Sequence, residues 1–275
     1  MVQWLFFFYF YCFAGWCFES TYVSIKSRQV VNRGFMRGPF LPLYGSGGMM
    51  MLIVSYPFRE HQILVYLAGC IGATALEYVT GVAMEALFKV RYWDYSNQKF
   101  NFQGHICLKS SLFWGVLTLI FTNILHKPIE HMILSIPGTV LAPVTLILTV
   151  IITADFSVSF KSAMDMRDIL VALEKVRTEM EHMKKRMDVL IAVADSDLNA
   201  LKEQGFENLE NLKTELAELR IRYNVSARMK EEMGQVKSFF QRKLMKAYPH
   251  MTSQKFKDVL EEFKTYLDGK IHGEE

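Results

Sequence analysis

Charge is scarce in the first part of this 275-residue sequence. Residues 1–160 hold 10 Lys and Arg and 7 Asp and Glu, whereas the remaining 115 residues hold 21 of each. A soluble domain of that length would carry more charge. The abrupt rise near residue 160 therefore indicates two parts of the chain in different surroundings, the first in lipid and the second in water.

Motifs of several enzyme classes are also missing. The sequence has no GxxxxGK[ST] phosphate-binding loop, no G-x-S-x-G elbow and no H-E-x-x-H helix. We therefore expect no enzyme activity, no catalytic residue, no cofactor and no ATP hydrolysis through a P-loop. His126, Glu130 and His131 are close in sequence, but their spacing matches no metal signature, so no metal site is expected.

The cysteines predict whether disulfides form, and the net charge bears on whether nucleic acid is a partner. The few cysteines lie in or beside apolar runs and form no loop framework, which favours buried reduced thiols over disulfides; they are Cys12, Cys17, Cys70 and Cys107. The formal net charge is only +3, and the charges after residue 160 balance. No basic surface suited to phosphates is therefore indicated, and nucleic acid is not an expected partner.

Five apolar stretches approach or reach the roughly 20 residues that a helix needs to cross a bilayer core. They cover residues 3–25, 40–58, 62–88, 106–125 and 132–154. The second contains Pro42 and three glycines, so it either spans the membrane or forms a bent, partly re-entrant segment. We predict an all-α protein with a transmembrane bundle of about five spans over residues 1–158 and a cytoplasmic helical or coiled-coil tail over residues 159–275.

The orientation follows from basic residues in the connections between these stretches. Loop one, after the first stretch, and loop three, after the third, are the basic ones, with Lys26, Arg28, Arg33 and Arg37 in loop one and Lys89, Arg91 and Lys99 in loop three. Loops two and four offer little beyond Arg59 and Lys127. The positive-inside rule then predicts an outside N-terminus, with loops one and three and the tail in the cytoplasm.

The tail has apolar residues at alternating spacings of three and four, as helices with one apolar seam do. One seam holds Leu173, Val176, Met180, Met183, Met187, Leu190, Ala194 and Leu201, and a second holds Leu209, Leu212, Leu216, Leu219 and Tyr223. Two helices or one interrupted coiled coil would produce this pattern, and either self-association or a docking surface would use it. Thr252 is a candidate N-cap for a short helix that carries Phe256, Val259, Leu260 and Phe263.

Acidic residues within the apolar stretches are the first functional candidates, because ionisable groups at membrane depth are costly. Glu19, Glu85 and Asp155 lie near predicted cytoplasmic ends, where they either pair with loop arginines or reach the interface. Glu77 is deeper. An unpaired carboxylate there is a candidate for carrying protons or binding a cation.

The two cytoplasmic loops supply the remaining candidates. In loop one, Arg33 and Arg37 carry donors suited to carboxylate or phosphate, and the backbone can turn sharply at Gly34, Gly38, Pro39 and Gly45. Loop three gathers Trp93, Asp94, Tyr95, Asn101 and His105. An interfacial aromatic belt accounts for Trp93 and Tyr95 but not for Asp94. We expect Arg33 and Arg37 to pair with Glu19, Glu85 and Asp94 at the cytoplasmic mouth of the bundle.

Successive motifs between about residues 10 and 155 resemble a known family. They are GWCFE, NRGFMRGPFLPLYGSGG, LEYVTGVAMEALF, RYWDYS, FNFQGHICL and SSLFWG, in this order. The resemblance is to the bacterial family called "Putative ABC-transporter type IV", the CmpB-like ABC transporter permeases. It implies a multi-pass permease of the bacterial cell membrane whose energy comes from a separate ATPase subunit. The motif positions are Glu19, Asn32, Arg33, Gly34, Gly38, Pro39, Tyr44, Gly45, Glu77, Gly81, Glu85, Trp93, Asp94, Tyr95, Ser96, Asn101, Gly104 and Trp114.

These observations favour a transport component that moves a small solute or ion. Glu77 would lie at the pathway, and Glu19, Arg33, Arg37, Glu85 and Asp94 would form the gate or the coupling surface. The expected partners are membrane lipid, a separate ATPase subunit, and a second copy or a coiled-coil partner. Two alternatives stay open: a membrane-anchored scaffold that acts through its tail, and an intramembrane enzyme with a carboxylate pair as acid and base and Arg33 or Arg37 holding a lipid-linked phosphate.

Overall fold

The computed structural model describes residues 1–200, 206–234, 245, 247–248, 251–261 and 264–265. The chain forms two compact units, one of Met1–Asp165 with Ser238–Lys255, and one of Met166–Lys237 with Phe256–Glu275. The segment Ser238–Lys255, which lies in the predicted tail, thus belongs to the first unit, and the division into residues 1–158 and 159–275 remains a prediction.

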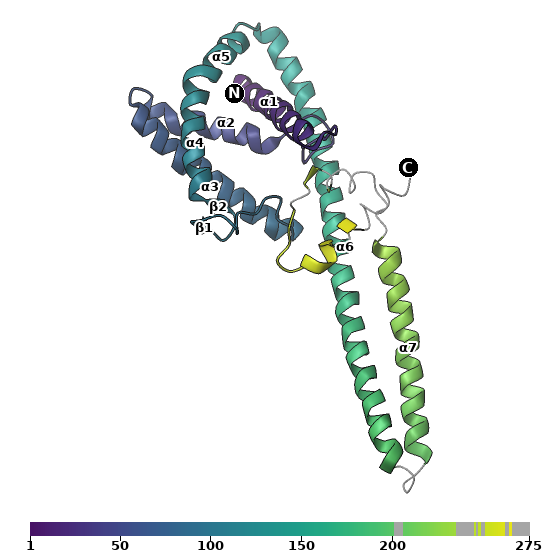
Figure 1. Ribbon diagram of the computed structural model, residues 1–275. Helices are drawn as coiled ribbons and strands as arrows, with labels where there is room; N and C mark the ends of the chain where they lie inside the picture. The colour runs from purple at the N-terminus through teal and green to yellow at the C-terminus, as the bar shows by residue number, and fades with distance from the viewer. Residues whose placement is uncertain (201–205, 235–244, 246, 249–250, 262–263, 266–275) are drawn as a thin grey trace. The chain divides into compact units, whose positions relative to one another are not determined.

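The first unit is built from helices and one small hairpin (Figure 1). Its helical elements are α1 (Val2–Ser27), α2 (Pro42–Ser55), η1 (Tyr56–Phe58), α3 (Gln62–Phe88), α4 (Leu108–Ile120), η2 (Phe121–Leu125), α5 (His126–Leu134) and the first part of α6 (Gly138–Ala200). Between α3 and α4, β1 (Asn101–Phe102) pairs antiparallel with β2 (Ile106–Cys107), with Asn101 opposite Cys107. The predominantly helical fold predicted from the sequence is confirmed.

Three helical stretches among the described residues are long and apolar enough to cross a membrane: Gln62–Phe88, Leu108–Leu134 and Gly138–Ala192. They correspond to the third, fourth and fifth predicted spans. The 14 residues of α2 extend only about 21 Å at 1.5 Å per residue, which is less than a bilayer core of about 30 Å. A count of five spans therefore stays a prediction.

The predicted fourth loop, after residue 125, is wrong in position. Helical structure continues through the π-helical turn η2 and through α5, and the chain turns only at residues 135–137. Pro128 lacks the N–H that would bond the carbonyl of Ile124. Because a π-turn accommodates a break in the regular bonding, η2 lets the helix pass this proline.

Glycines let neighbouring helices of the first unit approach closely. A Cβ on Gly45 of α2 would collide with the Cys12 thiol and the Phe8 carbonyl of α1, and a Cβ on Gly69 of α3 would collide with Thr118 of α4. Small residues at crossings are the usual means by which helices pack in lipid, where burial of apolar surface provides little drive.

The first part of α6 is anchored to α1. Phe7, Tyr11, Ile133 and Leu141 form a buried apolar cluster that joins α1, α5 and α6. The Tyr9 hydroxyl donates to Thr149 Oγ1 at 2.9 Å, and the hydroxyl of Tyr11 lies 2.6 Å from His126 Nδ1. These contacts hold the first part of α6 against α1 and α5 within the first unit.

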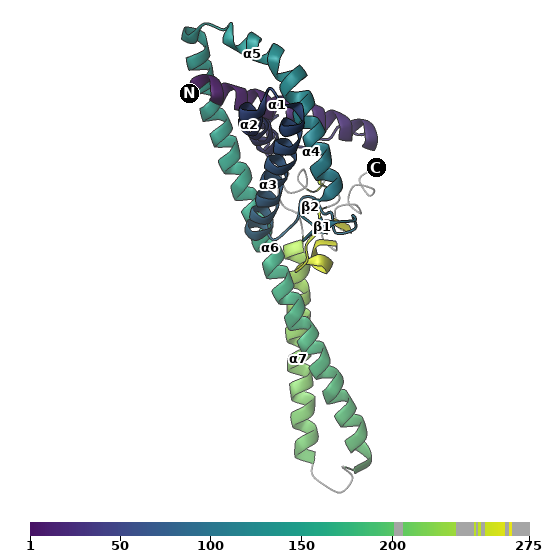
Figure 2. The same ribbon diagram turned by 90° about the vertical axis from the view of Figure 1, so that its left-hand side faces the viewer.

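In the second unit, the later part of α6 lies beside α7 (Phe206–Gly234), as Figures 1 and 2 both show. An ion pair joins Arg186 to Glu215, and another joins Arg177 to Asp258 at 2.7 Å. The seam residues Leu173, Val176, Met180, Met183, Met187, Leu190, Leu216, Leu219 and Tyr223 are buried or half-buried. The side chains of Ala194, Leu201, Leu209 and Leu212 lie outside the described residues.

Thr252 is not a helix cap. Its backbone pairs with Arg91 in an isolated antiparallel bridge, and helical structure begins only at Lys257. Phe256, Val259 and Leu260 are buried as an apolar helix face would be, and Phe263 lies outside the described residues.

The contact between α1 and α2 can be tested with a matched pair of substitutions. Gly45→Ala should destabilise the protein by about 1–3 kcal/mol, because α1 must move to admit the methyl group. Gly47→Ala in the same helix has nothing within 4 Å of the new Cβ, and it should be neutral or stabilising by up to about 1 kcal/mol. Thermal unfolding in mild detergent measures both. Equal shifts would show that α1 does not approach α2 at Gly45.

Candidate functional site

Polar side chains of the first unit gather in three groups around loops one and three. Each group centres on a glutamate that the sequence singled out. We name them the Glu19 group, the Glu85 group and the Glu77 group, and define each below by its residues.

The Glu19 group consists of Glu19, Arg33, Tyr44, Ala247 and Tyr248. The expected ion pair is present, with Arg33 Nε 3.2 Å from Glu19 Oε1, and the Tyr44 hydroxyl donates to Glu19 Oε2 at 2.6 Å. The Arg33 guanidinium lies 4.5 Å from the centre of the Tyr248 ring and donates to the Ala247 carbonyl. The Tyr248 hydroxyl in turn donates to the Arg33 carbonyl at 2.9 Å. Loop one is thus held from both sides.

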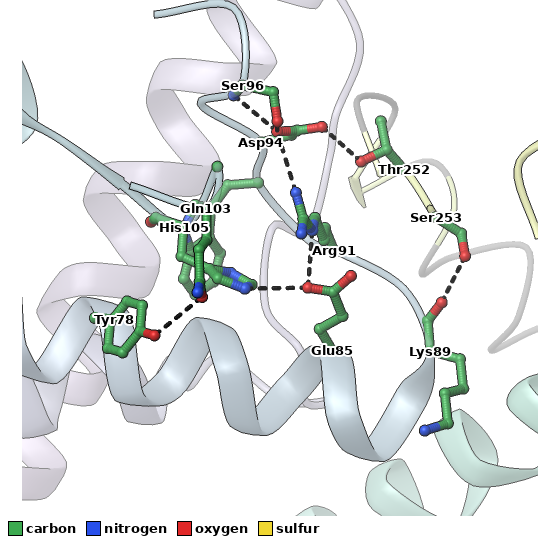
Figure 3. Close-up of polar contacts among 12 residues, drawn as sticks. Tyr78, Glu85, Lys89, Arg91, Asp94, Ser96, Gln103, His105, Thr252 and Ser253 are labelled. Carbon is green, nitrogen blue, oxygen red and sulfur yellow. Dashed lines mark hydrogen bonds and ion pairs between the residues drawn. The ribbon is translucent and has the colours of Figure 1, made fainter. Parts of the chain in front are cut away.

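The Glu85 group consists of Glu85, Arg91, Asp94, His105 and Thr252 (Figure 3). Arg91 Nε lies 2.8 Å from Glu85 Oε2, and Arg91 Nη1 lies 3.8 Å from Asp94 Oδ1. His105 Nε2 lies 3.1 Å from Glu85 Oε2, and the Thr252 hydroxyl donates to Asp94 Oδ2 at 3.0 Å. Only 5% of the Arg91 side chain is exposed, so this arginine is the buried centre of the group.

The predicted partners of Glu85 and Asp94 were therefore wrong. Both acids pair with Arg91 and not with Arg33 or Arg37. The reason is a local reversal of the chain: Lys89 ends α3 in the left-handed conformation with φ of 61°. The turn brings Arg91 back to Glu85, six residues earlier in the chain.

Two residues of the Glu85 group, Asp94 and His105, have lowered pKa values. Burial opposes charge on Asp94, but hydrogen bonds from Ser96 and Thr252 and the charge of Arg91 outweigh it, so the pKa of Asp94 lies below its usual value. Burial, aided by the charge of Arg91, also lowers the pKa of His105, against the opposing influence of Glu85 and Asp94.

The Glu77 group consists of Glu77, Tyr95, Ser110 and Trp114. Glu77 is 7% exposed within α3. Its Oε1 accepts from the Tyr95 hydroxyl at 3.0 Å, and its Oε2 accepts from Trp114 Nε1 at 3.0 Å and from the Ser110 hydroxyl at 3.3 Å. The carboxylate expected to be unpaired is held instead by neutral donors from loop three and α4.

Trp93, Tyr95 and Asn101 also shape the backbone of loop three. Trp93 Nε1 donates to the His105 carbonyl at 3.0 Å, and the Tyr95 N–H donates to the Gly104 carbonyl at 2.8 Å. Asn101 caps the turn, because its Nδ2 donates to two carbonyls of the loop and its Oδ1 accepts from the Gly104 N–H at 3.2 Å. Gly104 has φ of 73°, and a Cβ there would collide with the neighbouring side chains, so glycine is required.

Loop one contacts Asp155 of α6 through backbone N–H groups. The N–H groups of Arg37 and Gly38 donate to Asp155 at 3.2 and 2.7 Å. Gly34 donates its N–H to Asn32 Oδ1 at 2.9 Å, and Pro39 lies in the irregular segment that leads into α2. These residues position loop one, and in the part of the chain that the structure describes no contact joins them to Glu85 or Asp94.

Arg91, Tyr248, Thr252 and Ser253 are the functional candidates that sequence reasoning missed. Arg91 stands six residues after Glu85 and three before Asp94, a spacing that could have identified it as their partner. The other three lie more than 150 residues along the chain from their contacts and have no local signal; Ser253, for example, donates its hydroxyl to the Lys89 carbonyl at 2.7 Å.

His126 and Glu130 lie far along the chain from these loops. His126 Nε2 is 3.8 Å from Glu130 Oε2, while its other nitrogen meets Tyr11. Within the part of the chain that the structure describes, no three His, Cys, Asp or Glu side chains are placed to hold a metal ion.

Loops one and three lie within the part of the chain that matches a model of a known protein family. The family model described as "Putative ABC-transporter type IV" matches residues 6–160, which is more than half of the chain. The chain belongs to this family. The match contains all three glutamates, both loops and the three apolar helical stretches up to residue 160, so this is a membrane protein of a transporter family. No curated protein and no solved structure matches the chain.

The titration of His105 predicts a pH dependence. Its folded pKa lies below the value of about 6.5 for an unfolded chain, so the unfolded state takes up protons first. The stability due to neutral His105 is complete above about pH 6.5 and is lost as the pH falls toward the folded pKa. Thermal unfolding between about pH 5 and 8 should show this loss in the wild type and a flatter profile in His105→Gln. His61→Gln, at an exposed histidine, should keep the wild-type profile, and a wild-type slope in His105→Gln would contradict the assignment.

The docking of Tyr248 predicts a graded response. Tyr248→Phe keeps the ring contacts with Arg33 and Tyr92, the latter at 4.8 Å between centroids, and loses one hydrogen bond at a cost of about 1 kcal/mol. Tyr248→Ala removes every contact and should cost about 3–5 kcal/mol. The order of stability, wild type above Tyr248→Phe above Tyr248→Ala, can be measured by thermal unfolding and by the rate of limited proteolysis at residue 248. An alanine variant as stable as the wild type would show that this segment does not hold loop one.

Proposed function

We propose that this protein is an integral membrane component of an ABC-type transporter that moves a small solute or ion. The observation that carries the proposal is membership of the transporter family over residues 6–160. The sequence contains no GxxxxGK[ST] motif, so we propose that the chain is not itself an enzyme and that a separate ATPase subunit supplies the energy. The proposed orientation has an outside N-terminus, with loops one and three and the tail in the cytoplasm of a bacterium.

The geometry of the loops supports a docking surface for that subunit. Ion pairs and hydrogen bonds fix loop one and loop three. Two residues of the returning segment contact these loops: Tyr248 bonds the Arg33 carbonyl, and Thr252 bonds Arg91 and Asp94. A fixed surface suits a permease, because force from an ATPase must reach the membrane helices without being absorbed in a soft loop.

Glu77 supports a route from that surface into the membrane. Its carboxylate joins Tyr95 of loop three to Trp114 and Ser110 of α4. A displacement of loop three would pull on Tyr95, and Glu77 would have to exchange its donors. We propose Glu77 as a coupling residue between the loop surface and the transport pathway.

A second candidate, a membrane-anchored scaffold, has its own supporting observation. Ile221, Val225 and Met229 of α7 are 64%, 53% and 49% exposed, and their spacing of four places them on one face. An exposed apolar stripe on a helix suits a protein partner.

Purification of the full chain from native membranes, with mass spectrometry of the intact complex, decides between the two. The transport proposal expects a nucleotide-binding subunit to copurify in fixed stoichiometry. The Ile221→Glu variant should retain this subunit. The scaffold proposal expects another protein or a second copy, lost in Ile221→Glu. If the chain is purified as a monomer with no other protein bound, both proposals are contradicted.

Within such a complex, Glu77→Gln should impair function more than Met180→Lys. Glutamine cannot accept from three donors as a carboxylate does, so we expect ATP hydrolysis by the complex to change on the order of tenfold while the complex stays assembled. Met180→Lys, at a half-buried seam position of α6, should leave hydrolysis near the wild-type rate. The reverse order of severity would place the function in the tail.

A further inference from the structure

Loop three exposes two phenylalanines at its β1–β2 hairpin. The side chains of Phe100 and Phe102 are 81% and 54% exposed. Phe100 also has a positive φ of 54°, a backbone conformation that is costly for a bulky residue. The described part of the chain thus leaves an apolar surface uncovered here. Exposed apolar surface of this kind marks contact with a membrane or with a protein.

The contact of the hairpin with α3 gives its depth. The rings of Phe102 and Tyr78 have centroids 5.5 Å apart, and the Tyr78 hydroxyl donates to Gln103 Oε1 at 3.0 Å (Figure 3). Tyr78 stands ten residues before Phe88, the last residue of α3, which is about 15 Å along a helix. The 27 residues of α3 extend about 40 Å, roughly 10 Å more than a bilayer core needs. Even with this whole surplus at the Phe88 end, Tyr78 would reach the core, and Phe102 lies beside it.

The start of α4 places the other phenylalanine at the membrane boundary. Leu108 is the first residue of the stretch Leu108–Leu134, which is long and apolar enough to cross a membrane. Its N–H donates to the Phe100 carbonyl at 3.2 Å. Leu108 and Leu112 lie one turn apart on α4 and are 49% and 47% exposed. The exposed apolar surface of the hairpin therefore continues along a face of the membrane helix.

The charges beside this apolar surface are positive. Lys99 and Lys109 flank it in the sequence and are both exposed, and within the described residues neither forms an ion pair. No Asp or Glu occurs between Asp94 and Glu130, and Asp94 is already engaged in the Glu85 group. Lysines beside apolar side chains at a membrane boundary suit anionic lipid headgroups. We name Lys99, Phe100, Phe102, Leu108 and Lys109 the hairpin surface.

We propose that the hairpin surface anchors loop three in the interface of an anionic lipid bilayer. Phe100 and Phe102 would lie among the headgroups and the upper acyl chains, and Lys99 and Lys109 would contact lipid phosphates. Interfacial segments of proteins combine aromatic and basic residues in this way. The partner is the leaflet at the Phe88 end of α3, which is the cytoplasmic leaflet in the proposed orientation. The anchor goes beyond the proposed transport function, because it needs α3 and α4 to cross a membrane but needs no ATPase subunit.

The test uses the full chain in vesicles of phosphatidylcholine and phosphatidylglycerol. A spin label on Phe100→Cys reports its collisions with oxygen, which concentrates in lipid, and with a water-soluble nickel complex. The label at position 100 should collide more with oxygen than with nickel. Asn97→Cys, at an exposed residue of the same loop outside the hairpin surface, carries the same label and should give the reverse order. Wild type treated with the label gives the background from the native cysteines.

The two lysines are tested in the Phe100→Cys protein. Each lysine near an anionic surface changes partitioning on the order of fivefold, so the label should lie deeper in vesicles with phosphatidylglycerol than in phosphatidylcholine alone. Lys99→Gln/Lys109→Gln should abolish this difference, and Lys99→Arg/Lys109→Arg should keep it. Equal depth in both lipids before the lysines are changed would contradict their contact with headgroups.

Two results at position 100 would overturn the anchor. A label as accessible to nickel as the label at position 97 would show that the hairpin surface lies in water. A label shielded from both oxygen and nickel would show that protein covers it, such as a second copy of the chain. Equal unfolding temperatures of the labelled variants and the wild type exclude misfolding as the cause of either result.

Discussion

A carboxylate at the edge of an apolar helix must receive hydrogen bonds from protein, because lipid offers none and burial without donors is costly. Glu19 and Glu85 lie near helix ends and Glu77 lies within α3, and all three have this need. None finds its donors on its own helix: Glu19 uses Arg33 and Tyr44, Glu85 uses Arg91, and Glu77 uses donors from loop three and α4. The need to satisfy three acids therefore dictates how both loops fold, and the loop surface is a consequence of it.

The same requirement explains why Ala247 and Thr252 contact the loops of the first unit. Arg33 needs acceptors besides Glu19, and Ala247 supplies a carbonyl; Asp94 needs donors besides Arg91, and Thr252 supplies a hydroxyl. The chain leaves the first unit at Asp165 and returns at Ser238. The helical pair of the second unit is thus inserted in the sequence between two segments of the first unit.

Local periodicity carried most of the fold prediction. Apolar stretches located the long helices, and seam spacing identified the buried side of α6 and α7, because both depend only on neighbouring residues. The Glu19–Arg33 pair was predictable because both residues flank one helix end. The partner of Glu85 was not, since it depends on the left-handed turn at Lys89. Tyr248 and Thr252 could not be assigned at all, because their contacts join residues that only tertiary structure brings together.

The Glu77 and Glu85 groups are linked through two residues of loop three. Tyr95 donates its hydroxyl to Glu77 and its N–H to the carbonyl of Gly104. Gly104 in turn packs against Arg91 and Asp94 so closely that no side chain fits. A shift of Arg91 would therefore displace Gly104 and with it the backbone of Tyr95, and the hydroxyl could not stay on Glu77. Because packed residues transmit displacement, a displacement of Arg91 would reach the hydrogen bonds of Glu77, which we propose as the coupling residue.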